Sequence, residues 1–430
     1  MLNFGPHPLI NRPQESTLQA ANVCKDPTDK ISSERTSMNI TISRSISAAF
    51  GLLTCAAALT AMTITQNAHA NDLLVYFGTY TNQGSTSKGI YFSHLDTKTG
   101  KLSAPELAAE TVNPSFLVLH PNRKYLYAVN EVGQYKGKAS GYVTAYAIDA
   151  KSGKLKELNQ QPTDGTDPCH IEVDNKGKHV LIANYSSGSA IVLPIQADGS
   201  LGPRTSFVQH TGTSVNKARQ EGPHAHSANL DSSNKHAIID DLGIDKVMVY
   251  KYDGAKGTLT PNDPPSAQID AGSGPRHFAF HPSEKFAYVI NELSSTVVVM
   301  TYDAVKGALI PFQTLSTLPT DFAGESFCAE LKMHPNGKFL YGSNRGHDSL
   351  AIFSVDQETG RLTAVGYQST MGKIPRNFDI EPSGKLLLAA NQESNSVHTF
   401  RIDTETGKLT PTGEYIEIGK PVCVVFMPAK

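Results

Sequence analysis

Two arginines, Arg276 and Arg376, stand in the same local setting: each follows a proline and precedes a phenylalanine by two positions. A guanidinium group carries a rigid fork of donors that suits a carboxylate, a phosphate or the oxyanion that develops on a carbonyl group. The pair is therefore predicted to bind an anion or to polarise a carbonyl. The alternative is that each arginine only neutralises a nearby acid such as Glu292, Asp240 or Asp241.

The densest polar cluster of the chain runs from Arg219 to Ser227 and includes Glu221, His224 and His226. Two histidines separated by one residue on a strand share a face, and such a pair can ligate a metal when a third ligand is present. The sequence offers no second histidine pair of similar spacing, so we expect no metal and no cofactor. A role for His226 as a general base or a substrate-binding group is favoured, because imidazole titrates near neutral pH.

Three further ionisable residues, His170, Glu330 and Arg345, each occupy their position in one repeat of the chain only. A residue that merely builds a repeated unit should recur in every repeat, so these three are predicted to serve chemistry. Asn291 is also a candidate substrate-binding residue. The alternative for Asn291 is structural, because Asn recurs at this position and commonly caps a turn through its own side chain.

A repeat that returns seven times must position these residues. Its signature is Asp, three residues, Gly, one residue and Leu, and each copy follows an alternating apolar run. A period of roughly 50 residues built from strands and hairpin turns indicates a β-propeller. The copies are Asp96/Gly100/Leu102, Asp149/Gly153/Leu155, Asp253/Gly257/Leu259, Asp303/Gly307/Leu309, Asp356/Gly360/Leu362, Asp403/Gly407/Leu409 and a shortened Asp198/Gly199/Leu201.

Six repeats are contiguous, and the seventh is divided between the two ends of the region. An apolar run at 422–426 matches an innermost strand, while residues 73–102 supply a second strand, a third strand and an outer hairpin. Joining the two parts would close the circle and remove both exposed sheet edges. We therefore predict an all-β, seven-bladed β-propeller over residues 71–430, whose last blade combines a C-terminal inner strand with N-terminal strands.

Closure of the ring brings two series of positions to one rim, because the start of each inner strand and the end of the second strand lie on the same face of an antiparallel blade. Counted back from the hairpin, Glu330 aligns with His277 and Asn377 rather than with Arg276. Side chains alternate along a strand, so some of these residues are expected to point away from the channel. The series are Ser115, His170, His226, Arg276, Glu330, Arg376 and Cys423 for the inner strands, and Tyr80, Glu131, Tyr185, Asp241, Glu292, Arg345 and Gln392 for the second strands.

The composition excludes several classes of function. The 430 residues carry a formal net charge of −2, without the clustered Lys and Arg that nucleic-acid binding requires, so no nucleic-acid partner is expected. Past residue 70 three cysteines remain, Cys169, Cys328 and Cys423, at wide spacing. An odd number of widely spaced cysteines implies no disulfide framework, and each is expected to be a small buried thiol.

The N-terminal residues predict export. Residues 38–70 combine a basic residue, an apolar stretch and the sequence Ala68-His69-Ala70, which is the pattern of a cleaved signal peptide. We expect cleavage after Ala70, a periplasmic or secreted protein and no stable membrane span after processing. An uncleaved membrane anchor is the alternative. Residues 1–37 are polar and patternless and are interpreted as a non-native or unstructured extension.

Taken together, these motifs resemble the lactonase family of seven-bladed propellers, which includes propeller-type 6-phosphogluconolactonases and carboxy-muconate cyclases. The resemblance implies hydrolysis of a sugar δ-lactone by Arg, His and Glu side chains around the mouth, without a required metal. A phosphorylated lactone arises in the cytosol, so export favours an unphosphorylated aldonolactone. The matching segments are Arg219–Ser227, 274–277, 289–293, 329–331, 344–346 and 375–378.

The expected mechanism is ring opening by water. Arg276 would stabilise the oxyanion, with help from Arg376 or Arg345. Glu330 or His226 would take the proton from water, and His170 would return one to the ring oxygen. Two alternatives remain open: a muconate-type cycloisomerase, and a non-catalytic propeller that binds a ligand or a protein at its rim. The remaining substrate-binding candidates are Arg219, Glu221, His224 and Asn291.

Overall fold

The computed structural model describes residues 72–82 and 84–427. The predicted extension at 1–37 and signal peptide at 38–70 lie outside the described residues, and both stay predictions. Within the described part, no helix is long and apolar enough to cross a membrane.

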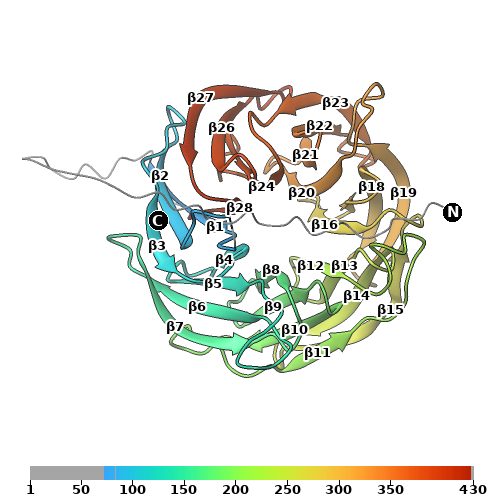
Figure 1. Cartoon of the computed structure of the whole chain (residues 1–430). Helices are drawn as coiled ribbons and strands as arrows, with labels where there is room; N and C mark the ends of the chain where they lie inside the picture. The colour runs from blue at the N-terminus through green and yellow to red at the C-terminus, as the bar shows by residue number, and fades with distance from the viewer. Residues whose placement is uncertain (1–71, 83, 428–430) are drawn as a thin grey trace, which may run out of the picture. The chain divides into compact units, whose positions relative to one another are not determined.

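The described residues form seven four-stranded antiparallel sheets arranged around a common centre (Figure 1). Each sheet is given from its inner to its outer strand. The first is β28 (Pro421–Met427), β1 (Asp72–Thr79), β2 (Gly89–Asp96) and β3 (Glu106–Glu110), and the second is β4 (Phe116–Leu119), β5 (Tyr125–Asn130), β6 (Tyr142–Ile148) and β7 (Leu155–Pro162). The third is β8 (Pro168–Val173), β9 (His179–Asn184), β10 (Ser189–Pro194) and β11 (Ser206–Gln209), and the fourth is β12 (Ala225–Leu230), β13 (His236–Asp241), β14 (Lys246–Asp253) and β15 (Thr258–Gln268). The other three are β16 (Pro275–Phe280), β17 (Phe286–Asn291), β18 (Thr296–Asp303), β19 (Ala308–Ser316); β20 (Phe327–Met333), β21 (Phe339–Arg345), β22 (Ser349–Val355), β23 (Leu362–Ser369); and β24 (Pro375–Ile380), β25 (Leu386–Asn391), β26 (Ser396–Ile402), β27 (Leu409–Glu417).

The prediction of a seven-bladed propeller is confirmed, including its mode of closure. Strand β28 pairs with β1 in antiparallel register, with Gly78 opposite Cys423 and Leu74 opposite Met427. Figure 1 shows β28, the last described strand, beside the blue strand β1 that begins the ring. The ring is therefore continuous, and the inner strands of all seven sheets face one central channel.

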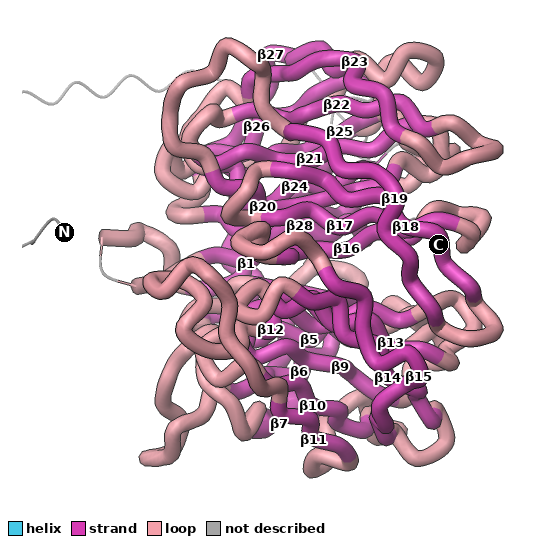
Figure 2. The backbone as a smooth tube through the Cα atoms, turned by 90° about the vertical axis from the view of Figure 1, so that its right-hand side faces the viewer, coloured by secondary structure: helices cyan, strands magenta, loops and turns pink. Residues whose placement is uncertain are grey.

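Stacking of neighbouring sheets buries the core, as the side view in Figure 2 illustrates. The repeated Asp-to-Leu hairpin has a role in this stacking. Its glycine has a positive φ, which an L side chain rarely adopts, and its carbonyl accepts a hydrogen bond from a tyrosine of the preceding blade. Four blade junctions use this contact: Tyr76 to Gly153, Tyr127 to Gly199, Tyr288 to Gly360 and Tyr341 to Gly407.

Two other blade junctions carry a buried group of Asp, His and Tyr side chains. The Asp231 carboxylate contacts His236 Nδ1 at 3.1 Å and accepts a hydrogen bond of 3.0 Å from the Tyr302 hydroxyl of the next blade. Asp174, His179 and Tyr252 repeat this arrangement one junction earlier. Burial would raise the pKa of Asp231, but backbone hydrogen bonds from His236 and Lys235 hold it below its usual value. The acceptor of the Tyr302 hydroxyl is therefore an ionised carboxylate.

Tyr302→Phe is expected to lower the free energy of unfolding by about 1.5–3 kcal/mol, because a hydrogen bond to an ionised group is lost. Tyr288→Phe is the matched control: it loses a bond to the neutral Gly360 carbonyl and should cost about 0.5–1.5 kcal/mol. Urea denaturation of both variants measures the difference. Equal losses would show that the charge of Asp231 adds nothing to the junction.

Candidate active site

The inner strands reach the channel with an irregularity that repeats from blade to blade. Their pairing with the second strand skips one residue near the start, which leaves Cys169 in β8, His226 in β12, Arg276 in β16 and Arg376 in β24 without a partner. A residue left unpaired in this way is a β-bulge, which re-aims side chains at strand ends. We call these four residues the bulge tier.

Three residues directly follow a bulge, His170, His277 and Asn377, and Glu330 lies within the irregularity of β20. We call this set, His170, His277, Glu330 and Asn377, the inner tier. Both Arg276 and its neighbour His277 line a central pocket, as do Arg376 and Asn377. At Arg276 and Arg376 the bulge lets two consecutive side chains face the same space, whereas His170 and Glu330 line neither the cavity nor this pocket, as alternation predicts for some of these residues. His170 and Glu330 lie one position further along their strands than the sequence series placed them.

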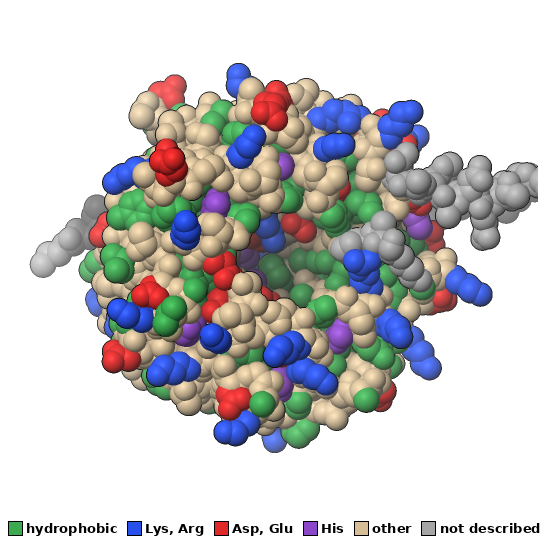
Figure 3. Space-filling model, turned by 180° about the vertical axis from the view of Figure 1, so that it is seen from behind, with side chains coloured by type: hydrophobic (Ala, Val, Ile, Leu, Met, Phe, Trp, Pro, Cys, Tyr) green, Lys and Arg blue, Asp and Glu red, His purple; other side chains and the backbone are tan. Residues whose placement is uncertain are grey.

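A cavity of about 250 Å³ occupies the mouth of the channel. Figure 3 shows one face of the ring hollowed at its centre, with basic, acidic and histidine side chains visible in and around the hollow. A larger groove of about 440 Å³ lies at the edge of the first blade, beside β2, and shares no residue with this cavity. The cavity is lined by Glu131, Cys169, Tyr185, Arg219, His226, Glu292, Phe327, Arg345 and Arg376.

Three guanidinium groups contact the Glu292 carboxylate on one side of the cavity. Its carboxylate contacts Arg219 at 2.6 Å, Arg345 at 2.8 Å and Arg276 Nε at 2.9 Å. Burial would raise the pKa of Glu292, but Arg345, Arg276 and Arg219 hold it well below its usual value. Glu292 is thus a permanent carboxylate, and its bonds fix the orientation of all three arginines.

Arg276 donates more hydrogen bonds to other protein groups than the sequence suggested. Its Nε donates to Glu292 and its NH1 group donates to the Ala329 carbonyl at 2.7 Å, and the residue is 2% exposed. Burial, together with the charges of Arg345 and Arg376, lowers the pKa of Arg276 to about 10. The pairing with Glu292 that the sequence offered as the alternative role of Arg276 is therefore present.

Arg376 has a different environment. It lines both the cavity and the pocket below it, and no described residue accepts a hydrogen bond from it. Its guanidinium carbon lies 5.3 Å from the centre of the Tyr80 ring, an arrangement that holds a cation against an aromatic face. The Tyr80 hydroxyl donates to both oxygens of Glu131 at 2.9 Å, which places that carboxylate beside Arg376. Arg376 is thus the guanidinium group of the cavity whose donors are all available to a ligand.

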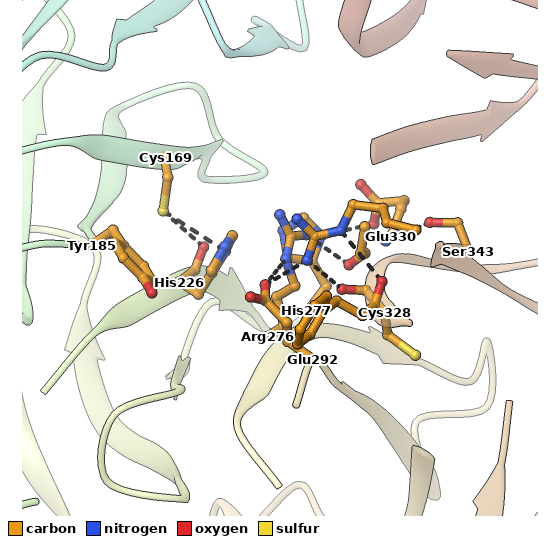
Figure 4. A network of polar contacts seen from close by, with 12 residues as sticks. Cys169, Tyr185, His226, Arg276, His277, Glu292, Cys328, Glu330 and Ser343 are labelled. Atoms are coloured by element: carbon orange, nitrogen blue, oxygen red, sulfur yellow. Dashed lines mark hydrogen bonds and ion pairs between the residues drawn. The ribbon is translucent and has the colours of Figure 1, made fainter. Parts of the chain in front are cut away.

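His226 faces the cavity opposite the arginine cluster, as Figure 4 shows. Its Nδ1 lies 3.8 Å from the Cys169 thiol, and its ring meets the edge of Tyr185 at 5.4 Å between centres. Burial and the charge of Arg276 lower the pKa of His226 well below its usual value. The imidazole is therefore neutral at pH 7. Cys169 is free and buried like Cys328 and Cys423, but it also lines the cavity, which the sequence did not indicate.

His277 and Glu330 form a buried pair beneath the cavity. His277 Nδ1 lies 2.9 Å from Glu330 Oε1, and the other carboxylate oxygen accepts a hydrogen bond from the Asn377 amide. The amide oxygen of Asn377 in turn accepts the backbone N–H of Val424 in β28 at 2.9 Å. Glu330 is 2% exposed and lines neither the cavity nor the pocket. Its carboxylate therefore acts on a ligand only through His277.

His170 belongs to the inner tier but does not line the cavity. Its ring packs against Phe116 at 4.4 Å and His277 at 5.5 Å between centres, and its Nδ1 accepts the backbone N–H of Ala228. Burial and the proximity of His277 lower its pKa well below the usual value. The expected role of His170 as proton donor to a substrate is not supported by this position.

Three other predicted substrate-binding residues lie outside the cavity. His224 stacks on the Tyr185 ring and bonds to the Tyr185 carbonyl and to the largely exposed Glu221, so the His-x-His pair is split by the bulge at His226. Asn291 is buried and donates to Thr296 Oγ1 at 2.9 Å, which is the structural role offered as its alternative. None of the three lines the cavity or the pocket below it, and their binding of substrate stays a prediction.

Several residues of the cavity were not among the sequence candidates. Glu131, Tyr185 and Glu292 directly follow second strands on the predicted rim, so the ring geometry contained the signal for them. His277 was visible as the residue that aligns with Glu330. Phe327 gave no signal, because an aromatic residue at the start of an apolar strand has the pattern of a core residue.

Among residues 72–82 and 84–427, no group of three His, Cys, Asp or Glu side chains is placed to hold a metal ion.

Residues 74–426 match a protein family described as lactonase, 7-bladed beta-propeller. The chain is 43% identical over 303 residues to the 6-phosphogluconolactonase of Bacillus subtilis strain 168, covering 70% of this chain and 83% of that protein. It is 36% identical over 313 residues to the 6-phosphogluconolactonase of Formosa agariphila, covering 71% of this chain and 86% of that protein.

A solved structure of the Pseudomonas aeruginosa periplasmic gluconolactonase is also similar. The TM-score is 0.78 at 34% sequence identity, and the similarity covers 84% of this chain and all of that chain. The resemblance therefore extends through the whole ring.

Proposed function

Because the chain belongs to the lactonase family of seven-bladed β-propellers and is a lactone-hydrolysing enzyme, we propose that its substrate is an unphosphorylated aldono-δ-lactone, opened by water in the central cavity. The product is the corresponding aldonate. The observation that carries this substrate class is the arrangement of Glu292, which takes a hydrogen bond or ion pair from each of three arginines at the mouth.

The hydrogen bonds that these arginines make within the protein bear on whether they can bind a phosphate. A phosphate is usually held by guanidinium forks whose paired donors are available to it. Here Arg219 and Arg345 direct donors to Glu292, and Arg345 also donates to the Phe327 and Cys328 carbonyls. The arginine side of the mouth thus directs part of its donors to Glu292 and to backbone carbonyls, and its remaining N–H groups can contact sugar hydroxyls. Arg376 is the arginine of the cavity from which no described residue accepts a hydrogen bond, so all of its donors are available for a carbonyl oxygen.

We assign to Arg376 the stabilisation of the oxyanion. Attack of water on the lactone carbonyl moves negative charge onto its oxygen, and a preorganised cation at that point lowers the barrier. The bulge at Arg376 fixes the guanidinium against Tyr80, so little reorganisation is needed when the charge develops. His226, on the opposite wall, is assigned to binding the hydroxyl groups of the lactone.

A 6-phosphorylated lactone is the second candidate substrate. The cavity lining carries Arg219, Arg345 and Arg376 against the acids Glu131 and Glu292, and this excess of positive charge favours an anionic ligand. Two relatives bear the name 6-phosphogluconolactonase. Activity against the phosphorylated compound therefore has to be measured beside activity against the neutral one.

We further propose that the protein is exported through residues 38–70 and cleaved after Ala70. The support is the pattern of these residues and the similarity to a periplasmic gluconolactonase. Export would separate the enzyme from the cytosolic source of phosphorylated lactones. N-terminal sequencing of the protein recovered from a periplasmic extract tests this proposal, and a start upstream of Asn71 would contradict it.

A pH-stat assay tests the substrate proposal. Purified protein is expected to release acid from glucono-δ-lactone with a larger kcat/KM than from its 6-phosphate, after subtraction of the spontaneous rate. A larger kcat/KM for the 6-phosphate would replace the first candidate by the second. Cyclisation of a muconate without lactone hydrolysis would support the cycloisomerase alternative instead.

A further inference from the structure

We propose that the hydrolytic water is bound beneath the lactone, in a separate pocket of the inner tier, and that His277 is the general base that activates it. Glu330 and Asn377 are positioning residues for His277. This inference rests on the proposed function only in taking a lactone as substrate. It differs from the expectation that Glu330 or His226 takes the proton directly.

The pocket has the size and chemistry of a site for one water. It measures about 10 Å³, lies below the cavity and shares Glu131, Cys169 and Arg376 with it. A pocket of roughly this accessible volume holds one water when two to four polar partners surround it. The polar side chains that line it are Ser115, Glu131, Arg276, His277, Arg376 and Asn377.

The hydrogen bonds of His277 decide which ring nitrogen is basic. Burial would raise the pKa of Glu330, but His277, Lys332 and the hydrogen bonds that it accepts lower it, so the group is a carboxylate. A carboxylate only accepts hydrogen bonds, so the proton of the neutral imidazole is on Nδ1, which donates to Glu330. The lone pair is on Nε2, and no described residue donates a hydrogen bond to that atom. A carboxylate that orients an imidazole while the other nitrogen removes a proton is a recurrent catalytic arrangement.

The charges around His277 keep it in the basic form. Burial lowers the pKa of His277 to about 4, Glu330 raises it, and Arg276 and Lys332 lower it. The rings of His170 and His226 also face His277 at 5.5 and 5.3 Å between centres, and the Phe116 ring lies 5.9 Å from it. His277 is therefore neutral at pH 7.

The step balances without a further reactant. The water oxygen forms a bond to the lactone carbonyl carbon while Nε2 of His277 takes one water proton, and the carbonyl electrons move to the oxygen beside Arg376. When the tetrahedral intermediate collapses, the bond from carbon to the ring oxygen breaks. The ring oxygen takes the proton from His277 and becomes a hydroxyl group. The carboxylic acid then releases its proton to solvent.

Kinetics of two variants test the proposal. His277→Ala is expected to lower kcat by about 10²-fold or more, with partial recovery on addition of imidazole. Glu330→Gln keeps an acceptor for Nδ1 but removes the charge that raises the pKa of His277. The wild-type kcat should fall as pH decreases through about 4, because His277 becomes protonated. In Glu330→Gln this acid limb should move to lower pH, a change that a purely structural role of Glu330 would not produce.

Two further variants complete the experiment. His398→Ala removes a histidine whose pKa is also lowered by burial but which stacks on Tyr415 at the outer edge of a blade, and its kcat and pH profile should match those of the wild type. His226→Ala should raise KM more than it lowers kcat. Folding is checked by circular dichroism and thermal melting.

The proposal is overturned if folded His277→Ala keeps kcat within threefold of the wild type, or if the acid limb of Glu330→Gln does not move. All comparisons use whichever lactone the wild type hydrolyses. A wrong substrate assignment therefore appears in the wild type itself, whereas a wrong base appears only in the variants.

Discussion

Replacing Arg376 with methionine is expected to lower kcat by about 10²–10³-fold, the usual consequence of losing one preorganised oxyanion donor. The side chain is replaced by one of similar length, so the contact with Tyr80 keeps its apolar part while the charge disappears. No described residue accepts a hydrogen bond from Arg376, so the substitution breaks no hydrogen bond, although it removes the positive charge beside Glu131. Steady-state kinetics with glucono-δ-lactone measure the effect, and thermal melting should give a nearly unchanged midpoint.

Arg401→Met is the matched control for this prediction. Arg401 lies on β26 of the same blade and donates to the Lys98 and Thr99 carbonyls at its outer edge, far from the channel. Its loss should leave kcat and KM unchanged. If Arg376→Met retains wild-type kcat while folded, the oxyanion must be stabilised elsewhere, for example by the NH2 group of Arg276, from which no described residue accepts a hydrogen bond.

Glu292→Gln is expected to be the most destabilising single substitution at the site. It leaves Arg219, Arg276 and Arg345 without their shared carboxylate, and removal of one partner from a buried ion pair costs about 3–5 kcal/mol. Urea denaturation of the wild type and the variant measures this loss. Activity should fall as well, because the three guanidinium groups lose the acceptor that sets their orientation.

A surface ion pair provides the comparison for Glu292. Glu106 contacts Lys154 at 3.2 Å with both side chains exposed, and Glu106→Gln should change the free energy of unfolding by no more than about 1 kcal/mol. Similar losses in the two variants would show that burial adds nothing to the Glu292 cluster.

The Glu292 cluster also predicts a pH dependence. Its pKa lies well below the value of 4.5 that the unfolded chain has, so the native state holds fewer protons at acidic pH. The stability that Glu292 contributes is fully present above pH 4.5 and is lost as pH falls through the folded value. Between pH 4.5 and 3, the free energy of unfolding should therefore fall more steeply for the wild type than for Glu292→Gln. Parallel curves would contradict this.

The ring and the identity of the rim could be predicted from the sequence, because both follow from a repeat. The Asp-to-Leu hairpin fixes where each blade turns, and antiparallel pairing then brings distant residues such as His226 and Arg376 to one mouth. These are consequences of strand order alone, so they do not depend on the exact position of a side chain.

The roles within the site could not be predicted in the same way. Strict alternation gives either Arg276 or His277 to the channel, and only the bulge gives both. The distinction between Arg276, which is bound to protein groups, and Arg376, which is not, depends on Glu292, which lies 16 residues beyond Arg276 and directly follows the neighbouring strand. Two arginines with the same local sequence thus differ because of what the next strand presents to them.

The inner tier depends on the final strand of the ring in a way that bears on when the enzyme becomes active. The amide oxygen of Asn377 is held by the Val424 backbone, and its amide nitrogen then points to Glu330. A nascent chain that still has residues 421–427 inside the ribosome lacks both the innermost strand of one blade and the contact that orients this carboxylate. Hydrolysis therefore begins only after translation has passed this strand.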